Sequence, residues 1–215
     1  MIDSENRNNH YGLWVAARVL SIASHPMLVP IYTMLMMLYL SNSPWYSLPG
    51  NYKSGVLLFV SLGTTLLPLV WMGVCLLLRI ITDIEMPNKT ERFWPLLLSC
   101  LTSFTTGILG NSLIQLPSVI RGMVFGVALL LLVAVIITPK WKISLHSLGL
   151  GALLAFVTII GTRMSIDFGE GLYIILVLSG LVGWSRLYLI AHTPLQLLIG
   201  YIVVFICMAI TLLIF

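Results

Sequence analysis

Seven long apolar runs occupy most of this 215-residue chain, and few charged residues interrupt them. A helix needs about 20 residues to cross the hydrocarbon of a bilayer, so runs of this length predict membrane spans. Hydrophobic residues make up 59% of the chain and charged residues only 8%, whereas soluble domains carry roughly 25% charged residues. A soluble fold of this size has no core that would bury so much apolar surface. The runs lie at 27–41, 55–81, 95–115, 121–138, 143–162, 170–188 and 194–215.

The runs are continuous rather than alternating, which favours helices over the strands of a membrane β-barrel. We therefore expect an all-α, polytopic membrane bundle of six or seven transmembrane helices. Seven is the first expectation. Six is the alternative, because two glycines and Asn111 interrupt the run at 95–115. The short run at 27–41 reaches spanning length if residues 12–24 continue it across a bend at His25 and Pro26.

The connections between the runs are short, so the chain is expected to form one membrane domain without a linker. Residues 1–26 are predicted to be an N-terminal interfacial segment, and 27–215 the membrane domain. The N-terminus is not typical of a secretory signal, because acidic residues and Arg18 interrupt it. The three cysteines fall inside apolar runs, which indicates buried apolar residues rather than disulfides or a metal site. They are Cys75, Cys100 and Cys207.

Alternate connections lie on opposite sides of the membrane, and one side collects most of the reactive side chains. We call this side face A; it holds the N-terminus and the connections at 82–94, 139–142 and 189–193. Face B holds the other connections, the C-terminus and no histidine. Three connections far apart in sequence thus deliver two histidines and several cations to one rim, which predicts a site there. The polar residues of face A are Asp83, Glu85, Lys89, Glu91, Arg92, Lys140, Lys142, Ser144, His146, Arg186 and His192.

Two of the predicted spans begin on face A beside a histidine. Thr193 and Gln196 form a Thr-x-x-Gln capping box, which starts the last span directly after His192. Ser144 is a plausible N-cap for the fifth span and would place His146 in its first turn. Helix N-termini present unpaired N–H groups and the positive end of the helix dipole, so they favour anions.

Cations accompany these helix starts. Lys89 and Arg92 are three residues apart, so one helical turn would place them on the same side. Arg186 precedes His192 by six residues. Guanidinium and ammonium donors, helix N-termini and a histidine pair suit a phosphate, since phosphoryl transfer needs a nucleophile and an acid for the leaving oxygen.

Three segments, in this order and spacing, resemble the signatures of the type-2 phosphatidic acid phosphatase superfamily, which includes the vanadium haloperoxidases. The resemblance covers about 85–205, and its last segment is the most specific. The matching residues are Lys89, Arg92 and Pro95; Ser144 and His146; and Ser185, Arg186, His192 and Gly200.

The resemblance implies a phosphatase mechanism without a metal or other cofactor. His192 would attack phosphorus to form a phosphohistidine, and His146 would protonate the leaving oxygen. Substrates would be lipid phosphates such as phosphatidic acid, phosphatidylglycerophosphate, polyprenyl diphosphates or lipid A. The implied phosphate-binding residues are Lys89, Arg92, Ser144 and Arg186, with Gln196 and Ser185 in supporting positions.

The chain departs from the family pattern in each segment. Gln196 stands where the family places an aspartate that orients the nucleophilic histidine and stabilises its positive charge. Ile143 and Leu145 replace a proline and a glycine, and only two residues separate Lys89 from Arg92. These departures predict weak activity or none.

Other functions remain open on the sequence. A non-catalytic relative would bind an anionic lipid, scaffold other membrane proteins or act as a transporter, although no acidic residue lies at mid-depth of a span. A metallohydrolase would use Asp83, Glu85, His146 and His192, but these lack a typical metal-ligand spacing. No basic cluster with interleaved aromatics predicts a nucleic-acid partner. The expected partners are membrane lipids and the lipid phosphate itself, and the oligomeric state is left open.

The chain is expected to be an integral membrane protein of a bacterial-type inner membrane. Face A carries eight lysines and arginines against three on face B, which favours a cytoplasmic face A. Without the proposed ligands Lys89, Arg92 and Arg186, the count is five against three and decides little. The resemblance implies an extracytoplasmic site.

Overall fold

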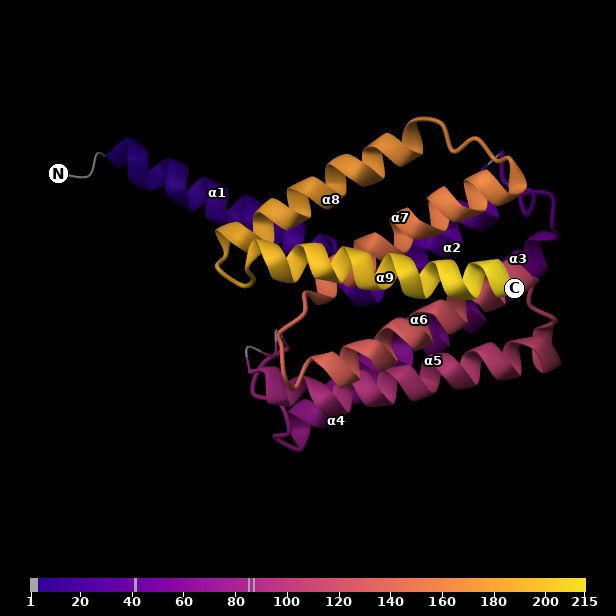
Figure 1. The fold of residues 1–215 in the computed structure, drawn as a ribbon, viewed down its shortest axis with the longest axis horizontal. Helices are drawn as coiled ribbons and strands as arrows, with labels where there is room; N and C mark the ends of the chain where they lie inside the picture. The colour runs from indigo at the N-terminus through magenta and orange to yellow at the C-terminus, as the bar shows by residue number, and fades with distance from the viewer. Residues whose placement is uncertain (1–3, 41, 85, 87) are drawn as a thin grey trace.

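The computed structural model describes residues 4–40, 42–84, 86 and 88–215 and folds them into a bundle of long helices (Figure 1). The helical elements, in chain order, are α1 (Ser4–Ala23), η1 (Pro26–Leu28), α2 (Val29–Tyr39), α3 (Gly50–Ser61), η2 (Leu62–Leu66), α4 (Leu67–Leu77), η3 (Lys89–Arg92), α5 (Phe93–Ile114), α6 (Ser118–Ile137), α7 (Leu145–Met164), α8 (Glu170–Tyr188) and α9 (Pro194–Ile214).

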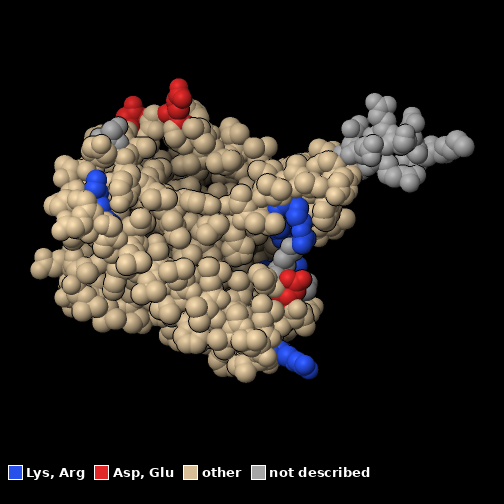
Figure 2. All heavy atoms as spheres, turned by 180° about the vertical axis from the view of Figure 1, so that it is seen from behind, with Lys and Arg blue, Asp and Glu red and all other residues tan. Residues whose placement is uncertain are grey.

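Seven helical segments of the described chain are long and apolar enough to cross a membrane, which confirms the expected all-α bundle. The third of them is continuous, because α5 runs unbroken through the glycines and Asn111 that weakened the prediction. The surface agrees with a membrane-spanning bundle. In Figure 2 the visible charged side chains lie toward two opposite ends, and a belt of uncharged surface separates them. The segments are Tyr11–Tyr39, Gly50–Leu77, Lys89–Ile114, Ser118–Ile137, Leu145–Met164, Glu170–Tyr188 and Pro194–Ile214.

The first two spans are irregular where they meet. The first bends between α1 and α2, where His25 caps η1 by accepting a hydrogen bond from the Met27 amide. The second joins α3 to α4 through a π-helical turn, η2. Thr65 of this turn donates its hydroxyl hydrogen to the Met27 carbonyl at 2.8 Å. This bond fixes the bend of the first span against the second.

Helix α7 forms the most buried part of the bundle and packs along α9. Glycines allow the close approach of other neighbours, as Gly122 and Gly126 of the fourth span, four residues apart on α6, illustrate. A Cβ placed on Gly126 of α6 would lie 2.5 Å from Met208 Sδ of α9. The small residues of α6 therefore serve helix packing.

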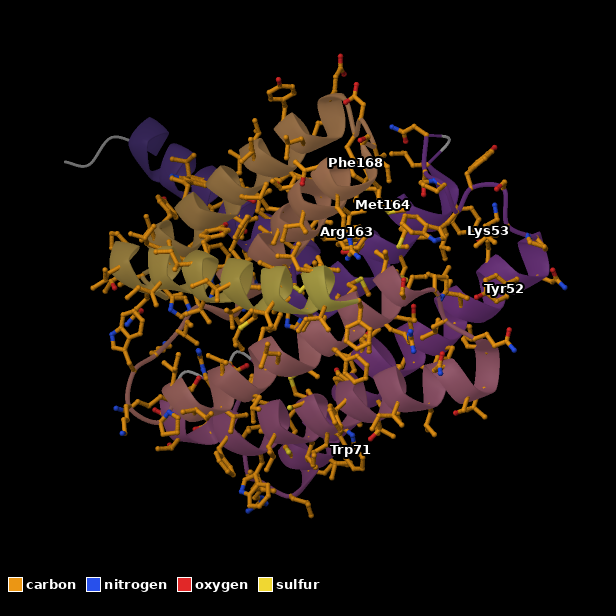
Figure 3. All side chains as sticks on the ribbon, turned by 45° about the vertical axis from the view of Figure 1, so that its right-hand side comes forward. Tyr52, Lys53, Trp71, Arg163, Met164 and Phe168 are labelled. Atoms are coloured by element: carbon orange, nitrogen blue, oxygen red, sulfur yellow. The ribbon has the colours of Figure 1, made fainter. Side chains whose placement is uncertain are left out.

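The helix ends separate the two faces as predicted. The N-terminal helix and the connections after α4, α6 and α8 lie at one end of the bundle, and the C-terminus lies at the other (Figure 1). At the C-terminal end, Arg163 donates to the Leu212 carbonyl, and Lys53 lies 4.9 Å from the centres of the Tyr39 and Tyr46 rings (Figure 3). The cations of face B therefore hold the bundle together locally.

Candidate functional site

A cavity of about 490 Å³ opens at the face A end, between the last turn of α1 and the starts of the later spans. Its volume lies within the range of roughly 300–1,000 Å³ that is typical of small-molecule sites. Four of the predicted site residues line it, and they come from three separate stretches of the chain: Arg92, His146, and Arg186 with His192.

The turn after α8 explains why Arg186 and His192 share this cavity. The chain reverses at Ile190, which has a left-handed φ of 53°, and the Ala191 amide donates to the Arg186 carbonyl at 3.0 Å. Thr193 and Gln196 then form the predicted capping box and begin α9. His192 is thereby held between the end of one span and the start of the next.

Gln196 determines which ring nitrogen of His192 carries the hydrogen. Its Oε1 atom accepts the Thr193 amide hydrogen at 3.1 Å and lies 3.1 Å from His192 Nδ1. Because the Thr193 amide is a donor, the atom facing both groups is the amide oxygen, which only accepts. His192 therefore carries its hydrogen on Nδ1 and keeps the lone pair on Nε2, as a nucleophile requires.

His192 is only 9% exposed, and this burial lowers its pKa to about 4. The bond to Gln196 opposes the shift, and the positive charges of Arg92, Arg186 and Lys142 add to it. Burial disfavours the charged imidazolium, so the pKa falls. His192 is consequently neutral at neutral pH.

The second histidine lies in the first turn of α7, as predicted, and meets the N-terminal helix. His146 Nε2 lies 3.0 Å from the Ser21 carbonyl oxygen and 3.3 Å from the Ser21 hydroxyl. Since a carbonyl only accepts, His146 carries its hydrogen on Nε2. The His25 ring stands edge-on to the His146 ring, with the two centres 6.0 Å apart.

The two arginines of the cavity are almost fully buried. Arg92 Nε donates to the Met86 carbonyl at 3.1 Å, and Arg92 Nη1 donates to the Ile143 carbonyl at 3.0 Å. Arg186 Nη1 donates to the Ser21 hydroxyl at 2.6 Å. Carbonyls and hydroxyls carry only partial negative charge, so these bonds leave the positive charge of Arg92 unneutralised. A buried positive charge of this kind favours an anion.

Three predicted residues serve the framework of the site instead of lining the cavity. Ser144 caps α7, and its hydroxyl accepts the Ser147 amide hydrogen at 3.4 Å. Ser185 donates its hydroxyl hydrogen to the Ala17 carbonyl at 2.7 Å and so ties α8 to α1. Lys89 is exposed, and its Nζ donates to the Lys140 carbonyl at 3.3 Å. The spacing of Lys89 and Arg92 thus does not bring both side chains into the cavity.

Sequence reasoning missed the contribution of α1. Arg18, Ser21 and His25 all line the cavity. The bend at His25 was predicted, but no motif signals a contact between residue 21 and residues more than 120 positions later. Asp83 lines the cavity as well, whereas Glu85 lies outside the described residues.

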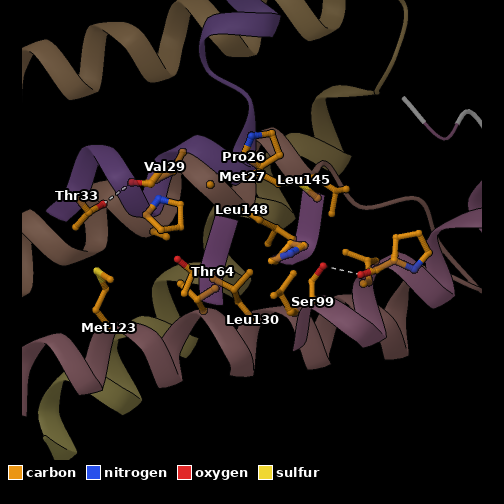
Figure 4. Close-up of a pocket in the computed structure, with 18 of the residues that line it drawn as sticks. Pro26, Met27, Val29, Thr33, Thr64, Ser99, Met123, Leu130, Leu145 and Leu148 are labelled. Atoms are coloured by element: carbon orange, nitrogen blue, oxygen red, sulfur yellow. Dashed lines mark hydrogen bonds between the residues drawn. The ribbon is translucent and has the colours of Figure 1, made fainter. Parts of the chain in front are cut away.

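A second cavity, of about 90 Å³, lies deeper in the bundle and is almost entirely apolar (Figure 4). Pro26, Met27, Met86 and Leu145 line both cavities, so the two adjoin. The rest of the wall includes Leu130 of α6 and Leu148 of α7. Polar groups thus gather at the face A end, and apolar space continues toward the middle of the bundle.

Comparisons with known proteins add no relative to this picture, since no family model, curated protein or solved structure matches the chain. Among the described residues, no group of three histidine, cysteine or acidic side chains is placed to hold a metal ion. The site is therefore interpreted from its own geometry.

Proposed function

We propose that this chain is a membrane lipid-phosphate phosphatase that works through a phosphohistidine on His192. The observation that carries the proposal is the meeting of two imidazoles and two guanidiniums in one cavity wall. They come from η3, from the start of α7, and from the end of α8 with the turn that follows it, three stretches that are far apart in sequence. The order and spacing of the family-like segments support the same assignment.

In the first step, the lone pair of His192 Nε2 attacks phosphorus and the bond from phosphorus to the lipid oxygen breaks. His146, which keeps its own hydrogen on Nε2, accepts the proton of the phosphate monoanion on Nδ1 and passes this proton to the leaving oxygen. Arg92 and Arg186 stabilise the negative charge that spreads over the phosphate oxygens. These donors are positioned by backbone and hydroxyl oxygens before substrate binds, which lowers the reorganisation that the reaction needs.

In the second step, water attacks the phosphohistidine and gives a proton to His146 Nδ1, which returns it to the departing phosphate. The bond from phosphorus to His192 Nε2 breaks, and inorganic phosphate leaves. Gln196 accepts the Nδ1 hydrogen throughout. It orients the ring, but a neutral amide stabilises the positive charge of the intermediate less than a carboxylate would.

Two features favour a lipid over a soluble phosphate ester. The site lies at the end of membrane-spanning helices, and the polar cavity adjoins an apolar one. A cavity of about 90 Å³ holds only a short part of a hydrocarbon chain, so most of a lipid tail would remain between the helices and the bilayer. Phosphate at the polar cavity and hydrocarbon toward the bundle is the expected orientation.

The test is phosphate release by detergent-solubilised protein from a panel of lipid monophosphates and diphosphates. His192→Ala is expected to lower turnover by about 10³-fold or more, because it removes the nucleophile. His10→Ala, a histidine with no role in this mechanism, serves as the matched control. Activity retained in His192→Ala would remove His192 from the nucleophile role.

A non-catalytic anionic-lipid protein is the second candidate, and Gln196 is the residue that favours it. A neutral partner for His192 suits binding as well as catalysis. This candidate predicts that the wild-type protein binds lipid phosphates but releases no phosphate from any of them.

A further inference from the structure

The last turn of α1 enters the site, although most of this helix stands apart from the bundle (Figure 1). Its principal neighbour is α8, and Ser185 of α8 donates to the Ala17 carbonyl one turn before Ser21. Ser21 is only 7% exposed and lines the polar cavity. The N-terminal helix thus delivers a buried polar residue to a site otherwise built by η3, α7, α8 and the start of α9.

Both oxygens of Ser21 contact residues of the proposed mechanism. Its hydroxyl accepts the Arg186 Nη1 hydrogen at 2.6 Å, and its carbonyl oxygen accepts the His146 Nε2 hydrogen at 3.0 Å. Ser21 therefore joins a cavity guanidinium to a cavity imidazole. Neither bond would form if α1 turned away at Ala17.

We infer that Ser21 is a positioning residue of this site, which fixes the Nε2–H tautomer of His146 and the orientation of the Arg186 guanidinium. The inference rests on the proposed function in that both partners act on a bound phosphate. The Ser21 carbonyl accepts the hydrogen of His146, just as the Gln196 amide oxygen accepts the hydrogen of His192. Each imidazole is thus held at one nitrogen by a neutral oxygen, which assigns the other nitrogen to the substrate.

The hydroxyl has a further consequence for anion binding. A hydroxyl group can donate one hydrogen bond and accept two. Arg186 donates to Ser21 Oγ and the His146 Nε2 hydrogen is directed at the Ser21 carbonyl, so the Ser21 hydroxyl hydrogen is available for another acceptor. A phosphate oxygen in the cavity is the expected acceptor.

Ser21→Ala tests the inference by removing the hydroxyl, and Ser24→Ala is the matched control. Ser24 lies three residues further on, and among the described residues its hydroxyl donates only to the Leu20 carbonyl. We expect Ser21→Ala to reduce kcat/KM on a lipid phosphate by about 10- to 100-fold, the effect of losing a hydrogen bond to a charged group. Ser24→Ala is expected to behave like the wild type, and Ser21→Thr, which keeps the hydroxyl, is expected to restore most activity.

A second measurement separates this inference from the proposed function. Stabilisation of the protein by inorganic phosphate, read from the thermal unfolding midpoint, reports the anion site without turnover. If the wild type binds phosphate but releases none from lipids, the function fails, and weaker phosphate binding by Ser21→Ala still supports the inference. If the wild type is active and Ser21→Ala equals Ser24→Ala, Ser21 has no positioning role. Tighter phosphate binding or higher activity in Ser21→Ala would mean that Ser21 obstructs the site, and a wild type that neither binds nor hydrolyses would overturn both proposals.

The carbonyl contact has its own readout. Nitrogen NMR of the histidine-labelled protein distinguishes the two neutral tautomers, and His146→Gln identifies the signal. An Nε2–H signal for His146 is expected, with the same tautomer in Ser21→Ala, since the backbone carbonyl remains. An Nδ1–H signal would contradict the assigned bond.

Discussion

His192 is buried, and its hydrogen-bond partner is the neutral amide oxygen of Gln196 rather than a negatively charged carboxylate. Both features affect the pKa of His192. Burial lowers its pKa to about 4, while the bond to Gln196 only partly opposes the shift. Because the folded pKa lies below the usual value of about 6.5, the unfolded chain binds more protons between these two values. The stabilising contribution of neutral His192 is therefore complete above about pH 6.5 and is lost as the pH falls toward 4.

The same shift makes a prediction for catalysis. Activity needs neutral His192, so kcat/KM in the wild type is expected to rise with pH through about 4 and to have reached its plateau well below pH 6.5. Gln196→Glu keeps the capping box but adds a negative charge beside Nδ1, so it should move this rise to higher pH and increase turnover by about 10-fold. Gln196→Ala, which removes the acceptor, should lower turnover instead. The pH dependence of phosphate release checks all three proteins, and an unchanged profile in Gln196→Glu would contradict the assigned contact.

At the scale of the elements, local patterns were predictable and long-range contacts were not. The Thr193 capping box and the Ser144 cap follow from residues within one turn, and the structure contains both. The seven spans follow from hydropathy, because the bilayer selects for apolar runs of a set length. Ser21 gave no such signal, since its partners are 125 and 165 positions away.

The directions of the charged side chains were equally hidden from the sequence. Lys89 and Arg92 belong to one short helical element, yet Arg92 is buried against two carbonyls while Lys89 is exposed. The spacing in the sequence determines where each side chain leaves the backbone. Packing against another connection of the chain decides which of the two side chains is buried. That connection, which contains Ile143, joins α6 to α7 and is about 50 residues away in the sequence.

Helix α9 depends on Gly200 for its approach to the start of α7. A Cβ placed on Gly200 would lie 2.8 Å from Ser147 Cβ and 3.3 Å from the Ser144 carbonyl oxygen. Gly200→Ala is therefore expected to lower the free energy of unfolding by about 1–3 kcal/mol, as overpacking does. It should also reduce activity, because His146 follows Ser144 by two residues.

The matched control is Gly180→Ala on α8, where an added Cβ meets no atom within 4 Å. This variant should unfold at the wild-type temperature or slightly above it, since alanine is the better helix former. Thermal unfolding in detergent measures both variants. Equal midpoints for Gly180→Ala and Gly200→Ala would show that α7 and α9 do not pack as closely as described.

At the scale of the whole molecule, the two ends of the bundle use their cations differently. Arg163 and Lys53 of face B bind backbone carbonyls, and Arg121 lies 5.5 Å from the centre of the Phe215 ring. On face A, Arg18, Arg92 and Arg186 line the cavity. The lysine and arginine excess of face A thus includes residues that serve a site, which weakens it as a guide to orientation.

We predict that face A is extracytoplasmic. Thr90→Cys places a thiol on face A, at an exposed position of η3, and Asn51→Cys places one on face B, at an exposed position of α3. The three native cysteines are buried, so the parent protein provides a low labelling background. A membrane-impermeant maleimide added to intact cells should label Thr90→Cys and should reach Asn51→Cys only after permeabilisation. The reverse pattern would place the site on the cytoplasmic side in accordance with the charge excess, and labelling of both positions from one side would contradict the separation of faces A and B.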